Sequence, residues 1–169
     1  MSKSAKKGRS GAQGRSVARL TAVQALYVIE QTGVTVDTVL NDVLTHGLTG
    51  TTYIPNPDND ESEIETVLAE PDKLLLAAVL RGVLARQDDF DAMIGAALAR
   101  DWTVDRLEVI LRSILRAGAF ELAGRTEAPA RVVITEYVDV AHAFYAGPEV
   151  KMVNAVLDKI ARIARPDEF

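Results

Sequence analysis

The residues best suited to chemistry in this sequence are cations gathered at its N-terminus. The first 19 residues carry six basic side chains and no acidic one. These six are Lys3, Lys6, Lys7, Arg9, Arg15 and Arg19. The rest of the chain has 13 basic residues against 24 acidic ones, a balance of −11. A cationic end joined to an anionic body is typical of a protein whose end binds a polyanion.

Arg15 and Arg19 stand four residues apart at the predicted start of the first helix. Like charges at this spacing repel, and cations at a helix N-terminus oppose the macrodipole by roughly 0.3–1 kcal/mol each. A bound polyanion reverses that sign, so both are candidate contacts; the alternative is two solvated charges near a frayed end. The lysines and Arg9 are candidate nonspecific phosphate contacts or, alternatively, a solubility tail.

Other kinds of site have little support in the sequence. There is no cysteine, which excludes disulfides, thiolate metal sites and cysteine nucleophiles. His46 and His142 lie in unrelated contexts, so we predict no metal site. The carboxylates lie in an acidic loop or alternate with bases on helices, which does not indicate an acid–base pair. No phosphate-binding glycine motif occurs, so we expect no cofactor and no enzymatic activity.

Hydrophobic periodicity places these residues in an all-α fold, a compact single-domain bundle of about seven helices. Residues 1–14 are predicted to form a disordered basic tail, and residues 15–169 the folded domain. The predicted helices run over about 15–31, 35–46, 72 to a break near 87–89, 90–98, 104–124, 130–146 and 148–165. Thr103 is the expected N-cap of the fifth, which should be the central core helix.

Residues 47–62 (GLTGTTYIPNPDNDES) interrupt this pattern with glycines, prolines and Asn/Asp turn-formers. We predict an acidic loop insertion here, with room for a short helix around 62–69, and no strand anywhere. No run of about 18 apolar residues occurs, so we expect no membrane span. The basic N-terminus lacks the apolar stretch of a secretory signal, so we expect a cytoplasmic protein.

Three stretches carry motifs that point to a family. Residues 16–30 read SVARLTAVQALYVIE, and residues 101–122 read DWTVDRLEVILRSILRAGAFEL. Residues 128–160 contain APARVVITEYVDVAHAF and KMVNAVLDKI. In this order the chain resembles the NusB transcription antitermination family, with KxVNxVLDK after an upstream ILRxxxxEL as the specific combination. Thr135 and Tyr137 depart from the INEA sequence that the family has at this place.

The resemblance implies a helical domain that binds the boxA element of nascent single-stranded RNA. It implies NusE, a small-subunit ribosomal protein, as partner within an RNA polymerase antitermination complex that transcribes ribosomal RNA operons. It also strengthens the case for Arg15 and Arg19 as RNA contacts and adds Lys151 as a candidate. Two alternatives stay open: a protein-interaction module without RNA binding, and an accessory domain related to ribosomal RNA methyltransferases.

Three further side chains have both a structural and a functional interpretation. Tyr27 and Trp102 could stack on bases, but an aromatic at helical spacing is more often buried, and we expect both in the core. Arg116 lies opposite the apolar stripe of its helix and is a candidate structural ion-pair partner.

Overall fold

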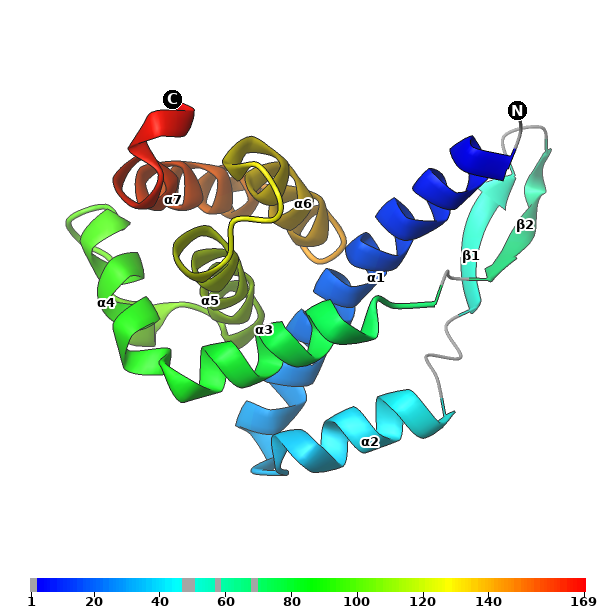
Figure 1. Cartoon of the computed structure of the whole chain (residues 1–169), viewed down its shortest axis with the longest axis horizontal. Helices are drawn as coiled ribbons and strands as arrows, with labels where there is room; N and C mark the ends of the chain where they lie inside the picture. The colour runs from blue at the N-terminus through cyan, green and yellow to red at the C-terminus, as the bar shows by residue number, and fades with distance from the viewer. Residues whose placement is uncertain (1–2, 47–50, 57–58, 68–69) are drawn as a thin grey trace.

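Seven α-helices make up most of what the computed structural model of this chain describes (Figure 1). It describes the backbone of residues 3–46, 51–56, 59–67 and 70–169, and the side chains of residues 11–46 and 70–169. The helices are α1 (Lys3–Thr32), α2 (Val36–His46), α3 (Lys73–Ala85), α4 (Gln87–Ala97), α5 (Val109–Gly124), α6 (Ala130–His142) and α7 (Pro148–Ala164). Two 3₁₀ turns cover Val104–Arg106 and Pro166–Glu168. The predicted helical bundle is confirmed.

The central helix is α5, as predicted. It packs against α1, α3, α4, α6 and α7, and Figure 1 shows these helices arranged around it. Ile114 and Leu115 are fully buried on it. A Cβ atom on Gly118 would lie 2.8 Å from the methyl carbons of Leu157, so the glycine lets α7 approach α5 closely. Together these contacts place α5 at the centre of the core.

Most helix ends lie where turn chemistry predicts them. Gly33, with φ of 72°, follows α1. The Asp72 carboxylate accepts the backbone N–H of Leu75 at 3.0 Å and caps α3. The predicted break between α3 and α4 occurs at Arg86. Thr103 is an exception, because it precedes the short 3₁₀ turn without a side-chain cap bond, and α5 begins only at Val109.

The insertion at 47–62 is not a plain loop. Strands β1 (Thr51–Asn56) and β2 (Asn59–Val67) pair antiparallel, with Thr51 opposite Val67 and an irregularity between Pro55 and Asn56. The expectations of a loop, of a short helix around 62–69 and of no strand were therefore wrong. The physical reason is local: TTYI is rich in β-branched and aromatic residues, which favour a pleated strand over a helix.

Helix α1 begins at Lys3, about three turns before the predicted start near Arg15. Ala, Lys, Arg and Gln in this stretch have high helix propensity and continue the helix despite three glycines. Arg15 and Arg19 therefore lie inside a helix and not at its N-terminus, so the macrodipole argument does not apply to them. Disorder of the tail stays a prediction. Residues 1–2 and the side chains of Lys3, Lys6, Lys7 and Arg9 lie outside the described part.

Within the described ranges, no helix has the length and apolar character that a membrane span requires.

We predict that Ile114→Ala lowers the free energy of unfolding by about 2–5 kcal/mol, because it leaves a cavity in a fully buried site. Chemical denaturation followed by circular dichroism measures this loss. Val132→Ala is the control, since Val132 is largely exposed and its truncation should cost under about 0.5 kcal/mol. Equal losses at the two sites would contradict the assignment of Ile114 to the core.

Candidate nucleic-acid interface

Arg15 lies on the exposed side of α1 where the entry to α3 touches it. The backbone N–H of Asp72 donates to the carbonyl of Gly14 at 2.9 Å. A Cβ on Gly14 would lie 3.0 Å from the carbonyl oxygen of Glu70, a tight contact that the glycine avoids. The contact fixes the backbone next to Arg15, whose own side chain is exposed.

A cleft of about 600 Å³ lies beside Arg15, between α1, the start of α3, the end of α5 and the start of α6. Its walls carry both signs of charge: Arg15 and Arg125 on one hand, Asp72, Glu127 and Glu136 on the other. An anion inside this cleft would meet carboxylates as well as guanidinium groups. The cleft itself therefore does not suit a phosphate, whereas the exposed Arg15 side chain can reach one outside it.

Arg19 has a different role from the predicted RNA contact, because only 3% of it is exposed. Its Nε and Nη2 donate to the two carboxylate oxygens of Glu121 at 2.8 and 2.9 Å, a bidentate pair. Its Nη1 donates to Glu136 Oε2 at 3.2 Å. All of these donors point into the protein. The expectation that Arg19 contacts RNA is corrected to that of a buried ion pair joining α1, α5 and α6.

Two hydroxyl groups extend this buried cluster. The Tyr137 hydroxyl, fully buried, donates to Glu121 Oε1 at 2.7 Å, and the Ser16 hydroxyl donates to Glu136 Oε2 at 2.7 Å. Burial raises the pKa of Tyr137 well above its usual value, and the charge of Glu121 and the hydrogen bond to it act in the same direction. Burial alone would lower the pKa of Arg19, but Glu121 outweighs it and the net pKa is raised. Arg19 therefore stays charged and Tyr137 neutral.

Lys151 is exposed on the first turn of α7, as a nucleic-acid contact requires. It lies on a different helix from Arg15, and α6 packs against both α1 and α7. A small hollow of about 160 Å³ between α1 and α6 carries Glu136 and Asp139. The surface where α6 meets α1 is therefore partly acidic.

Arg116 is the structural ion-pair partner that the sequence suggested. Its Nε and Nη2 donate to the two oxygens of Asp91 at 2.7 and 2.9 Å, and its Nη1 donates to Glu30 at 3.3 Å. The neighbouring Arg112 also pairs with Glu30 and donates to the carbonyl of Leu107 at 3.1 Å. Both arginines thereby tie the end of α1 to α4 and to the segment before α5.

Tyr27 and Trp102 are not core residues. They are 39% and 45% exposed, respectively, so the expectation that both are buried was wrong. Helical spacing places a side chain on a face but does not say whether a neighbouring helix covers that face. Both rings present part of their surface to solvent, and stacking on a base remains compatible with their positions.

The sequence did not predict the structural roles of Glu121, Tyr137 and Arg165. Arg165 is buried and donates to four backbone carbonyls: Glu121 at 2.7 Å, Leu122 at 2.9 Å, Ala128 at 2.6 Å and that of Arg125. It thus adds side-chain donors to carbonyl groups at and just after the C-terminus of α5, where backbone donors run short. A signal for Glu121 was present, since it is the one acidic residue of α5, a largely apolar helix. Among the described residues, no three metal-binding side chains come together.

Comparison with known proteins gives a consistent result. Residues 16–162 match the NusB family. The transcription antitermination protein NusB of Rhodospirillum rubrum is 47% identical, with 98% of this chain and 93% of the relative covered. NusB of Maricaulis maris is 41% identical, with 92% and 90% covered.

Two solved structures share the fold. T. maritima NusB has a TM-score of 0.70 and 24% identity, with 92% of this chain and 96% of that chain covered. A crystal structure of antitermination factors NusB and NusE in complex with dsRNA matches with a TM-score of 0.65, 23% identity and coverages of 88% and 96%. At these identities the likeness shows the fold alone.

We predict that Arg19→Ala lowers the free energy of unfolding by about 3–5 kcal/mol, because it leaves the Glu121 carboxylate buried without its cation. Arg15→Ala, a change of the same chemistry at an exposed site, should cost under about 0.5 kcal/mol. Urea unfolding of both variants measures the difference. A loss below about 1 kcal/mol at Arg19 would contradict the buried ion pair.

A second prediction concerns alkaline pH. Unfolded tyrosine ionises near pH 10, while Tyr137 in the folded protein keeps its proton. The folded state then binds more protons, so its stabilisation is complete below pH 10 and is lost as the pH rises further. The unfolding free energy of the parent should fall more steeply above pH 10 than that of Tyr137→Phe, by up to about 1.4 kcal/mol per pH unit. Parallel curves would show that Tyr137 does not contribute.

Proposed function

This chain belongs to the NusB family, and from that membership we propose that it is a transcription antitermination factor that binds boxA-type single-stranded RNA together with NusE. In that role it supports processive transcription of ribosomal RNA operons within the RNA polymerase antitermination complex. The observation that carries the proposal is the match over nearly the whole length to relatives named as transcription antitermination proteins. The solved complex of NusB and NusE with dsRNA supports the choice of partner.

The start of α1 supplies the electrostatic part of this proposal. We infer that Arg15, on the exposed side of α1, contacts the RNA backbone. Further contacts come from residues nearer the N-terminus of the same helix: Lys3, Lys6, Lys7 and Arg9. Lys151 on α7 is a second, separate contact. Arg19 is left out of the RNA site and acts as a positioning residue, because its ion pair with Glu121 fixes α1 and therefore Arg15 against the core.

Binding, and not catalysis, is the proposed mode of action, in the cytoplasm. Phosphate contacts by lysine and arginine release counterions, so the affinity should fall with salt. A protein-interaction module without RNA binding would show no such affinity, which separates the two functions. The methyltransferase-related alternative needs a cofactor-binding domain with a catalytic cysteine, and this sequence contains no cysteine.

The direct test is binding of boxA RNA to the full chain, with and without NusE, by fluorescence anisotropy. We expect binding that favours boxA over a scrambled RNA of the same composition and that tightens when NusE is present. Absence of RNA binding in both cases, with NusE still captured, would overturn RNA recognition in favour of the interaction module.

We predict that Arg15→Ala weakens RNA binding and reduces the slope of log affinity against log salt by about 0.7, the value for one phosphate contact on a single strand. The affinities for boxA and for scrambled RNA should fall by similar factors, since a phosphate contact carries no sequence information. Arg86→Ala is the matched control, because Arg86 is also exposed but lies at the junction of α3 and α4. An unchanged slope for Arg15→Ala would place the RNA contact elsewhere.

A further inference from the structure

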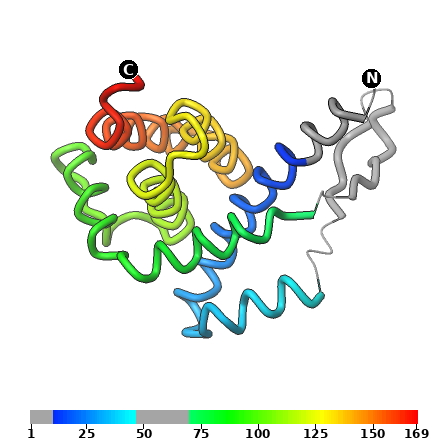
Figure 2. The backbone as a smooth tube through the Cα atoms, in the orientation of Figure 1, coloured from blue at the N-terminus to red at the C-terminus, as the bar shows by residue number. Residues whose placement is uncertain are grey.

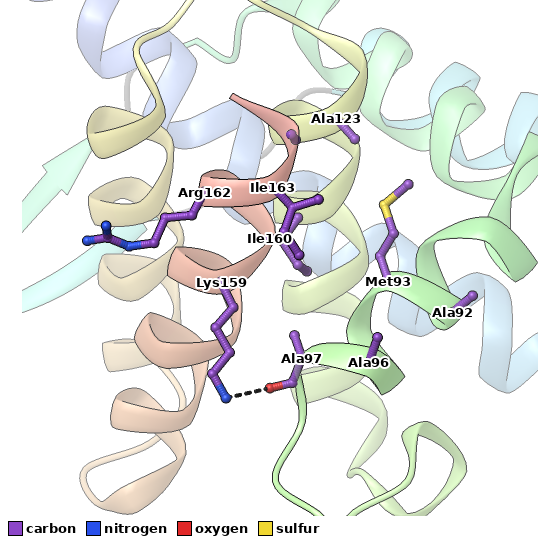
Figure 3. A pocket seen from close by; sticks show the side chains of 10 residues that line it. Ala92, Met93, Ala96, Ala97, Ala123, Lys159, Ile160, Arg162 and Ile163 are labelled. Carbon is purple, nitrogen blue, oxygen red and sulfur yellow. Dashed lines mark hydrogen bonds between the residues drawn. The ribbon is translucent and has the colours of Figure 1, made fainter. Parts of the chain in front are cut away.

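A groove of about 830 Å³ opens between α4 and α7, on the opposite side of the bundle from the start of α1 (Figures 1 and 3). The end of α5 contributes Ala123 to its wall. Figure 2 shows the same separation along the backbone, with α4 and the C-terminus at one side and α1 at the other. The groove is therefore distinct from the RNA contacts proposed above.

The lining of the groove is apolar and made mainly of small side chains. Helix α4 provides Ala92, Met93 and Ala96, and all three are at least partly exposed. Facing them, Ile163 of α7 is 81% exposed, although burial of an isoleucine side chain away from water is favourable. Figure 3 shows Ile163 and Met93 pointing into the space between the two helices. Alanines on such a wall let the backbone of another helix approach closely, and Ile163 offers it an apolar contact.

One cation lies at the mouth of this groove. Lys159 crosses from α7 and donates to the carbonyl of Ala97, the last residue of α4, at 3.3 Å (Figure 3). An ammonium group has three donors, so two remain for an acceptor from outside. Arg162 is turned away in Figure 3; it pairs with Asp158 at 2.8 Å and stacks on Phe169 at 4.7 Å from the ring centre. Lys159 is thus the charge that a ligand in the groove would meet.

We propose that this groove is a docking site for an amphipathic helix of a protein partner, with an apolar face against the alanines and Ile163 and a carboxylate at its edge against Lys159. The charge pattern distinguishes this occupant from a second copy of the chain. In a twofold dimer centred on Ile163, Lys159 and Arg162 would lie near their own copies and repel. A carboxylate on a different protein meets Lys159 without that cost.

The test uses two synthetic peptides of about fourteen residues, with leucine along one face and either glutamate or lysine at the edges. Fluorescence anisotropy measures their binding to the full chain. The net charge of −5 favours the lysine peptide, so specific docking in the groove must act against it. We expect the glutamate peptide to bind about tenfold more tightly than the lysine peptide, and Lys159→Glu to reverse that preference.

Ile163→Asp should lower the affinity for the glutamate peptide by about tenfold or more. The matched control is Leu74→Asp, because Leu74 is as exposed as Ile163, at 83%, but lies on α3 away from the groove. The Leu74→Asp variant should bind the glutamate peptide as tightly as the parent does. Circular dichroism establishes that each variant is folded, and boxA binding by Ile163→Asp should be unchanged. Failure of boxA binding in the parent would count against the proposed function alone.

Three results would overturn the docking site. The parent binds neither peptide; it prefers the lysine peptide, or binds both equally; or Leu74→Asp weakens binding as much as Ile163→Asp does. Analytical ultracentrifugation of the parent tests whether a second copy of the chain occupies the groove. A dimer that Ile163→Asp converts to a monomer would assign the groove to a second copy and overturn the proposal of a different partner.

Discussion

The buried ion pair between Arg19 and Glu121 is the constraint on which the rest of the molecule depends. It joins the long first helix to the central helix, and Tyr137 and Glu136 connect it to α6. A charge in this position is tolerable because both Glu121 oxygens and all three nitrogens of the Arg19 guanidinium group have partners. Close packing around it then fixes how the exposed side of α1 is presented to solvent. The buried Arg19 and the proposed RNA contact Arg15 thus lie four residues apart on one helix.

The sequence predicted the helical class, the seven helices and most of their ends, because each rests on local chemistry. Gly33, Asp72 and Pro148 act within one turn of where they stand. Strands β1 and β2 were missed because proline, asparagine and acidic residues lie within them, and these residues disfavour strands. Arg19 was misplaced for a different reason. Its partner Glu121 is 102 residues away, and no periodicity within α1 could show which face would meet it.

The departure of Tyr137 from the family's INEA sequence has a physical explanation in this cluster. A small residue at this position would leave Glu121 Oε1 with Arg19 as its donor, whereas Tyr137 adds a second donor and fills the space beside it.

The candidate RNA contacts were easier to predict as a group than one by one. Excess charge at one end is visible in composition, but the burial of each side chain depends on helices that come later in the chain.

Arg165 ties the end of the chain to the middle, and this order matters when the protein is made. The carbonyl of Glu121 is synthesised 44 residues before the guanidinium group that satisfies it. At about 5–20 residues per second, the ribosome needs roughly 2–9 s to cover that distance. During this interval the end of α5 lacks the side-chain donors of Arg165, and its apolar faces lack the completed α6 and α7. The packing around α5 is therefore completed only after Arg165 has been synthesised, and a nascent chain halted before α7 would expose the surface that α5 later buries.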